Sequence, residues 1–119
     1  MAHILVLDDE RDSAVLMQRI LNRQGHEVHL FTEEEEALAF ARAHPVDLAI
    51  LDIKLKKMSG IEVLAVLKKI NPAIHAMMLT GFPTLETARR ALGLGAEQYC
   101  VKPIEVGELE QKVADMLRS

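Results

Sequence analysis

The sequence predicts an α/β fold in which a single doubly wound, five-stranded parallel sheet carries helices on both faces. Strand-like apolar runs alternate five times with helix-like runs, and this alternation is typical of parallel strands joined by crossover helices. Residues 4–7 and 48–51 are uninterrupted apolar runs, which indicate strands buried on both sides. A length of 119 residues fits one domain, so we expect residues 1–119 to fold as a unit.

The first half of the chain predicts three strands and two helices. We expect strands at 4–8, 27–31 and 48–52, and the polar alternation of 27–31 favours an edge strand. The first helix should end at Gly25. Its expected core face comprises Ala14, Leu16, Met17, Ile20 and Leu21. Thr32–Glu35 predicts a capping box for the second helix, and we interpret its glutamates as a solvated helix start.

The second half of the chain continues the alternation. A capping box at Ser59–Glu62 predicts the start of the third helix, and Asn71–Pro72 predicts its end. The remaining expected elements are a strand at 75–80, a helix after 81–83, a strand at 98–101 and a helix at 106–118. We expect core positions for Met17, Met77, Met78, Met116 and the single cysteine, Cys100.

Composition excludes several classes of function. A formal net charge of −4 argues against direct binding of nucleic acid, which normally needs clustered lysine and arginine. No apolar run approaches the roughly 20 residues of a membrane span, and no secretory leader is evident. We therefore expect a cytoplasmic location, with no membrane contact.

Polar residues that could bind a ligand or take part in a reaction follow four of the expected strands. Asp8 and Asp9 follow the first strand, Asp52 the third, Thr80 the fourth and Lys102 the fifth. Ligands of open α/β sheets bind beyond the carboxyl ends of the strands, so these side chains should meet there. Three adjacent carboxylates are costly unless a cation or a proton neutralises them; a divalent cation is the simplest way to keep all three ionised, and their hard oxygens favour Mg²⁺. A phosphoryl group could complete such a site, with a carboxylate as its nucleophilic acceptor.

In this order and spacing, these residues resemble the bacterial two-component response-regulator receiver domain over the whole chain. Met58-Ser59-Gly60 and Tyr99 are supporting matches. The resemblance implies a flavodoxin-like receiver fold with strand order 2-1-3-4-5. It also implies a phosphorylation-controlled signalling switch that accepts a phosphoryl group from a sensor histidine kinase or a histidine phosphotransfer protein. Such a domain is a regulatory phosphoacceptor, not an enzyme that turns over an external substrate.

The resemblance also implies roles for individual residues. Asp52 would be the phosphoacceptor and, with Asp9, a direct Mg²⁺ ligand. Asp8 would bind the ion through water, and the backbone carbonyl of Lys54 would complete the protein ligands. Lys102 would pair with the carboxylate before transfer and with the phosphoryl group afterwards, from a cis Lys102–Pro103 bond.

A switch pair follows from the same resemblance. Thr80 would move towards the phosphoryl group and Tyr99 would turn inward, which changes the surface of helix 4, strand 5 and helix 5. A homodimer through that surface is also implied. The stretch 80–88 is similar to receivers that precede ATPase-type activators of the sigma-54 class, which favours a longer regulator with an output domain.

Three residues near the site depart from the family pattern or vary within it. Lys56 stands where the family usually has proline, and either Lys54 or Lys56 could reach a carboxylate and weaken Mg²⁺ binding. Phe82 follows Thr80 by two positions, and a bulky ring there should hinder hydrolysis of the aspartyl phosphate.

Two other functions remain open from the sequence. The first is a phosphate-independent docking module whose carboxylates are idle. The second is a small Mg²⁺-dependent α/β phosphatase, which the sequence disfavours because Lys54 occupies the position of the usual acid–base aspartate.

Overall fold

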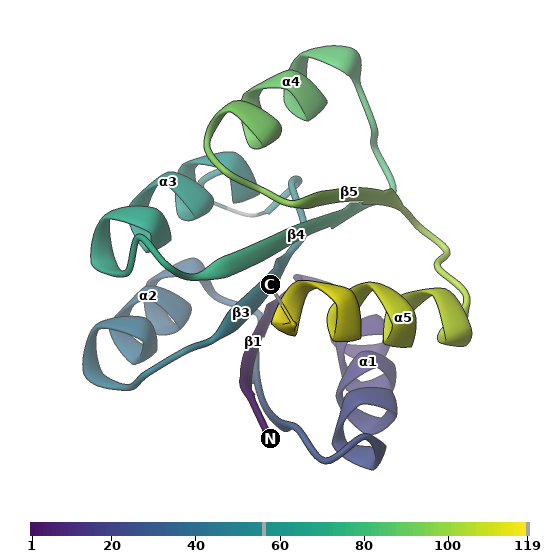
Figure 1. The fold of residues 1–119 in the computed structure, drawn as a ribbon. Coiled ribbons are helices and arrows are strands. Elements are labelled where there is room, and N and C mark those ends of the chain that lie inside the picture. The colour runs from purple at the N-terminus through teal and green to yellow at the C-terminus, as the bar shows by residue number, and fades with distance from the viewer. Residues whose placement is uncertain (56, 119) are drawn as a thin grey trace.

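A five-stranded parallel sheet lies at the centre of the computed structural model, which describes residues 1–55 and 57–118 (Figure 1). The strands are β1 (His3–Leu7), β2 (Glu27–Phe31), β3 (Leu48–Leu51), β4 (His75–Thr80) and β5 (Gln98–Val101). The helices are α1 (Arg11–Arg23), α2 (Glu34–Ala43), α3 (Gly60–Ile70), α4 (Leu85–Gly93) and α5 (Val106–Leu117). The strand order is β2-β1-β3-β4-β5, which confirms the predicted doubly wound topology and the edge position of β2.

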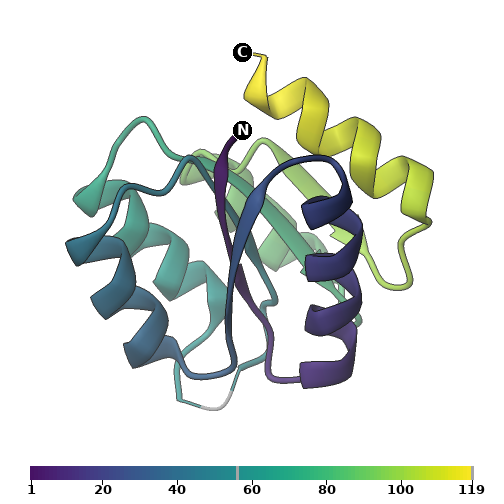
Figure 2. The same ribbon diagram turned by 90° about the horizontal axis from the view of Figure 1, so that it is seen from below.

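Helices cover both faces of the sheet, α1 and α5 on one side and α2, α3 and α4 on the other (Figures 1 and 2). Alternate residues of β1 supply the two cores. Ile4 and Val6 pack in the cluster that includes α1 and α5 residues, whereas Leu5 and Leu7 pack in the cluster on the α2, α3 and α4 side. The apolar run of β1 therefore reflects burial on both faces, as predicted.

Most predicted helix ends are confirmed by local geometry. Gly25 follows α1 with a φ of +89°, a conformation that glycine adopts without steric cost. Ser59 begins α3 with a complete capping box: its hydroxyl accepts from the backbone N–H of Glu62, whose carboxylate accepts from the N–H of Ser59. Asn71 lies at the C-cap of α3, before Pro72.

Three predictions about the first two helices are wrong. Leu16 is 58% exposed, because the buried stripe of α1 is narrower than its run of apolar residues. The capping box at Thr32–Glu35 does not form: Glu33 is the N-cap residue of α2 and its side chain caps no N–H group. Glu34 is buried instead of solvated, because its carboxylate contacts the loop that follows Asp52.

The remaining core predictions are confirmed. Cys100 and the four methionines expected in the core are buried: Met17, Met77, Met78 and Met116. Among the helices that the structure describes, none combines the length and apolar character that crossing a bilayer requires.

Candidate functional site

The carboxyl ends of β1 and β3 bring three aspartates together. Leu7 and Leu51 are paired in register, so the residues that follow them, Asp8 and Asp52, leave the sheet side by side. Carboxylate oxygens of Asp8, Asp9 and Asp52 all lie within 4.8 Å of one another. Asp8 and Asp52 are buried, whereas Asp9 is exposed.

Lys102 provides the positive charge of this cluster. Its Nζ donates to Oδ2 of Asp8 at 2.7 Å and to Oδ2 of Asp52 at 3.1 Å. The residue follows β5, and the Lys102–Pro103 peptide bond is cis, as the sequence resemblance implied. The predicted meeting of the strand ends is therefore present, and one ammonium faces several carboxylates.

Burial and the neighbouring charges shift the pKa values of Asp8 and Lys102. Burial raises the pKa of the Asp8 carboxyl above its usual value, and the nearby Asp52 adds to this, although Lys102 and the backbone N–H of Glu10 oppose it. Burial would lower the pKa of the Lys102 ammonium, but its hydrogen bonds and charge interactions with the two aspartates prevail and raise it. The lysine is thus charged at neutral pH, and the cluster favours additional positive charge.

One oxygen of Asp52 is left for a ligand. Oδ2 is held by Lys102, but Oδ1 is buried and has no hydrogen-bond partner in the described part of the chain. A buried, unpartnered carboxylate oxygen is costly and indicates a missing cation or hydrogen-bond donor. Asp9 and Asp52 line a pocket of about 420 Å³. The all-oxygen donor set and this orphaned oxygen fit Mg²⁺.

Glu34 supports the loop that follows Asp52, a role that the sequence did not reveal. Its side chain is 1% exposed, and Oε2 accepts from the backbone N–H of Lys57 at 2.6 Å and of Met58 at 2.9 Å. Burial acts to raise the pKa of Glu34, but the backbone N–H groups and the Lys57 charge together lower it. The interpretation of this residue as a solvated helix start is wrong. Its partners lie more than 20 residues away, where helix periodicity gives no signal.

Gly60 allows α3 to begin against the backbone of Asp52. A Cβ atom at this position would lie 1.9 Å from the Asp52 carbonyl oxygen and 2.8 Å from its carbonyl carbon. The N–H of Gly60 also donates to the carbonyl of Ile53 at 2.8 Å. Glycine at residue 60 therefore lets the start of α3 approach the main chain of Asp52 this closely.

Lys54 does not make the carboxylate contact that we expected. Its Nζ lies 4.3 Å from the centroid of the Phe82 ring, in a cation–π arrangement, and no ion pair of Lys54 occurs among the described residues. Phe82 is 61% exposed and lines the same pocket as Asp52. Lys56, the other lysine expected to modulate the site, lies outside the described residues.

The two residues of the expected switch, Thr80 and Tyr99, differ in burial and in their hydrogen-bond partners. Thr80 is fully buried at the end of β4, and its Oγ1 accepts from the N–H of Phe82 at 3.0 Å. Tyr99 is half-buried, and its hydroxyl lies 2.7 Å from Oγ1 of Thr87 and accepts from the N–H of Thr84 at 3.3 Å. The tyrosine is thus hydrogen-bonded to the start of α4.

Residues 4–114 match the family model described as the response regulator receiver domain. The chain belongs to this family. Transcriptional regulatory protein ZraR of Salmonella typhimurium is 35% identical over 114 residues, which are 96% of this chain and 26% of that protein. The alkaline phosphatase synthesis transcriptional regulatory protein PhoP of Bacillus subtilis is 36% identical over 115 residues, 97% of this chain and 48% of that protein. The receiver thus spans half or less of these relatives.

Solved structures agree with this assignment. A CheY-like response regulator receiver domain protein from Methanospirillum hungatei superposes with a TM-score of 0.96 at 32% identity, over 99% of this chain and 94% of that one. A response regulator protein from Burkholderia pseudomallei, with a phosphorylated aspartic acid, calcium ion and citrate, gives a TM-score of 0.88 at 31% identity, over 98% and 66% of the two chains. The chain is a flavodoxin-like receiver with a regulatory role in phosphorylation-controlled signalling by two-component systems.

Proposed function

We propose that this receiver accepts a phosphoryl group on Asp52 in an Mg²⁺-dependent reaction. The observation that carries the proposal is the asymmetry of the Asp52 carboxylate, in which Lys102 holds Oδ2 while Oδ1 is buried and has no partner among the described residues. Oδ1 would take Mg²⁺, and Oδ2 would become available to the incoming phosphorus as the Lys102 ammonium moves to the phosphoryl oxygens. The donor would be the phosphohistidine of a sensor histidine kinase or of a histidine phosphotransfer protein.

Asp9 and Asp52 would hold Mg²⁺ directly, together with the backbone carbonyl of Lys54. Asp8 suits a contact through water, because Oδ1 already accepts from the N–H of Glu10 at 2.9 Å and Oδ2 accepts from Lys102 at 2.7 Å. Bound there, Mg²⁺ would neutralise the carboxylates and the oxygens of the transferring phosphoryl group.

In the transfer itself, an Asp52 oxygen forms a bond to phosphorus as the phosphorus–nitrogen bond to the donor imidazole breaks. The bonding electron pair leaves with the imidazole. Lys102 stays protonated, since its raised pKa lies far above neutral pH, and its ammonium can follow the charge from the carboxylate to the phosphoryl oxygens. No acid–base group is needed in these steps, which agrees with a regulatory phosphoacceptor.

The phosphoryl group would then act on Thr80 and Tyr99. The Thr80 hydroxyl can turn its proton to a phosphoryl oxygen while its oxygen still accepts from Phe82. Tyr99 would exchange its hydrogen bonds to Thr84 and Thr87 for an inward position. This exchange would alter the surface of α4, β5 and α5, which we propose as the contact surface for a homodimer or for an output domain in a longer regulator.

Phe82 would lengthen the lifetime of the phosphoform. Its ring lines the Asp52 pocket and supports Lys54 at 4.3 Å, so it narrows the approach of the water that hydrolyses the acyl phosphate. Phe82→Ala should speed dephosphorylation, measured as the decay of phosphorylated protein after the donor is removed. An unchanged decay rate would contradict this role.

Intact-mass spectrometry after incubation with Mg²⁺ and acetyl phosphate tests the central proposal. One phosphoryl group should be added to the unaltered chain and none to Asp52→Asn, which keeps the shape of the side chain. EDTA should also abolish the adduct. Asp12→Asn, a change on α1 outside the pocket, is a matched control that should be phosphorylated normally. An adduct on Asp52→Asn would refute the assignment, and no adduct on the unaltered chain would favour a phosphate-independent docking module.

A further inference from the structure

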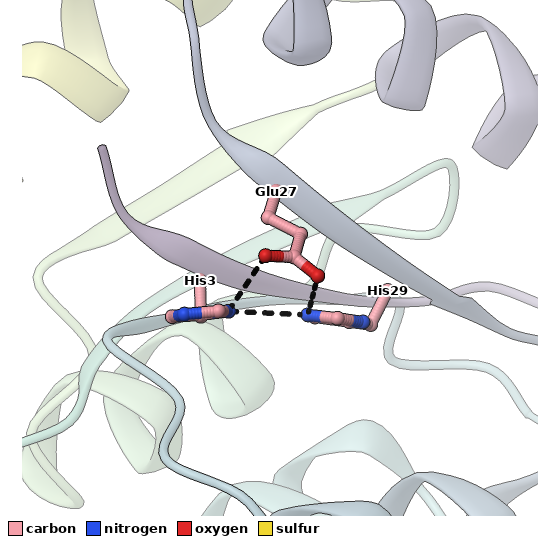
Figure 3. A group of neighbouring side chains, drawn as sticks. All are labelled: His3, Glu27 and His29. Carbon is pink, nitrogen blue, oxygen red and sulfur yellow. Dashed lines mark hydrogen bonds and ion pairs between the residues drawn. The ribbon is translucent and has the colours of Figure 1, made fainter.

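A second cluster of metal-ligating side chains lies at the opposite end of the sheet from the aspartates. His3 is the first residue of β1, whereas Asp8 follows its last residue. His3 and two residues of β2, Glu27 and His29, point towards one another (Figure 3). Each offers a nitrogen or oxygen atom within 4.8 Å of the others. The receiver function proposed above uses none of these three residues.

We propose that His3, Glu27 and His29 bind a divalent transition-metal ion, with Zn²⁺ as the ion that fits best. Two imidazoles and one carboxylate are a common zinc ligand set, in which water or a further ligand takes the fourth position. Mg²⁺ is disfavoured because it binds oxygen ligands, whereas imidazole suits zinc and its neighbours in the periodic table.

The spacing of the two imidazole nitrogens matches one edge of a tetrahedron. Zinc–nitrogen and zinc–oxygen bonds of about 2.0–2.1 Å at tetrahedral angles place ligand atoms roughly 3.3 Å apart. Nδ1 of His3 and Nε2 of His29 are 3.3 Å apart. Oε2 of Glu27 lies 3.5 Å from the first nitrogen and Oε1 lies 3.8 Å from the second, so the carboxylate faces both imidazoles. The glutamate has a long, 52% exposed side chain, so it can turn to bring one oxygen into bonding distance of the ion.

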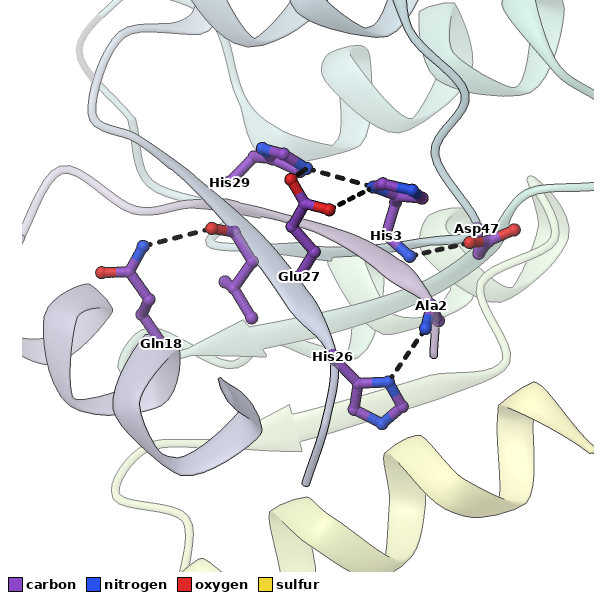
Figure 4. A network of polar contacts seen from close by, with 8 residues as sticks. Ala2, His3, Gln18, His26, Glu27, His29 and Asp47 are labelled. Carbon is purple, nitrogen blue, oxygen red and sulfur yellow. Dashed lines mark hydrogen bonds and ion pairs between the residues drawn. The ribbon is translucent and has the colours of Figure 1, made fainter. Parts of the chain in front are cut away.

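Paired strands hold these residues in place. Glu27 is the register partner of His3 in the parallel pairing of β1 and β2, and His29 lies two residues further along the same face of β2. The N–H of His3 donates to Oδ2 of Asp47 at 2.8 Å, which fixes the start of β1 (Figure 4). The His29 ring packs on Phe40 of α2 with centroids 4.4 Å apart. Ligands on regular, packed elements lose little freedom on binding.

Charge and access also suit a cation. The side chains of His3, Glu27 and His29 are 35%, 52% and 21% exposed, so an ion can enter from solvent. A neutral imidazole has the free lone pair that metal binding requires. The carboxylate of Glu27 offsets part of the ionic charge.

Zinc titration calorimetry on untagged protein tests the site. Asp9→Asn/Asp52→Asn protein serves as the parent, because these changes disable the aspartate pocket as a competing site. The parent should bind one equivalent of Zn²⁺, and its Tm should rise with zinc concentration. Co²⁺ should give the intense visible absorption of a tetrahedral complex.

Two variants and one control locate the ion. Glu27→Gln alters a half-exposed side chain and should abolish binding without unfolding the protein; His29→Ala should also abolish it. His75→Ala is the matched control, because His75 contacts Glu97 in a similar histidine–glutamate pair for which the described residues offer no third ligand, and it should bind zinc as the parent does. The proposal is refuted if the parent binds no zinc, if Glu27→Gln or His29→Ala retains binding, or if His75→Ala loses it.

Discussion

Replacement of Glu34 should destabilise the receiver more than its position in an acidic helix start suggests. Its Oε2 accepts two backbone N–H groups, of Lys57 and Met58. A hydrogen bond to a charged group contributes roughly 1.5–3 kcal/mol to stability when it is well shielded. A neutral amide oxygen in the same place would still accept both N–H groups, each for roughly 0.5–1.5 kcal/mol, so loss of the charge costs about 1 kcal/mol for each bond. Glu34→Gln should therefore cost about 2 kcal/mol.

Thermal unfolding followed by circular dichroism measures this cost. A chain of 119 residues unfolds with an entropy of about 0.25 kcal/mol/K, so 2 kcal/mol corresponds to a fall in Tm of about 8 °C. Glu35→Gln is the matched control, since that side chain is 81% exposed and contacts Lys57 only at 3.8 Å. The control should change stability by less than about 0.5 kcal/mol.

The pH dependence gives the sign of the effect. The pKa of Glu34 is lower in the folded protein than in the unfolded chain, so its contribution is complete above the unfolded value and is lost as the pH falls through the folded value. The Tm difference between the unaltered protein and Glu34→Gln should shrink as the pH falls below about 4.5. Equal Tm values for Glu34→Gln and Glu35→Gln at pH 7 would show that the buried contacts of Glu34 add nothing to the free energy of unfolding.

Three further predictions concern the site and its surroundings. Gly60→Ala should lower stability by about 1–3 kcal/mol and slow phosphorylation of Asp52, because the new methyl group must displace the Asp52 carbonyl; urea unfolding and mass spectrometry measure the two effects. Asp8→Asn should raise the Tm of metal-free protein by a few degrees at pH 7, since the raised pKa of Asp8 means that its ionised form costs stability above that pKa; the gain should vanish in acid. Thr87→Val should weaken the hold on the Tyr99 hydroxyl by about 1 kcal/mol, seen as faster amide exchange in α4, and an unchanged exchange rate would contradict this.

The fold was predictable because its signals are local and repeated. The apolar runs of β1 and β3 and the Ser59–Glu62 capping box report directly on structure. The meeting of Asp8 and Asp52 followed as well, since neighbouring parallel strands deliver their last residues to one edge. The position of Lys102 at the same edge was predictable because it follows the last residue of another parallel strand.

The failed predictions depend on contacts between distant parts of the chain. Glu34 has the sequence context of a solvated helix start, and only the position of the loop after β3 makes it a buried acceptor. Lys54 lies on the Phe82 ring instead of a carboxylate, a contact that the local sequence does not indicate, whereas the alternative, Lys56, lies outside the described residues and stays a prediction. Leu16 continues an apolar run, but the sheet and α5 leave it 58% exposed. In each case tertiary packing outweighs the local pattern.

The weak attachment of α4 leaves its outer face open to evolutionary change. Ala91 is its only buried residue, whereas Leu85 and Leu92 are exposed. Substitutions at such outward positions remove little apolar area from the core and so cost the domain little stability. New surfaces can therefore arise on α4 while the sheet and the aspartate pocket stay unchanged, which allows one scaffold to diversify without repeated loss of foldability.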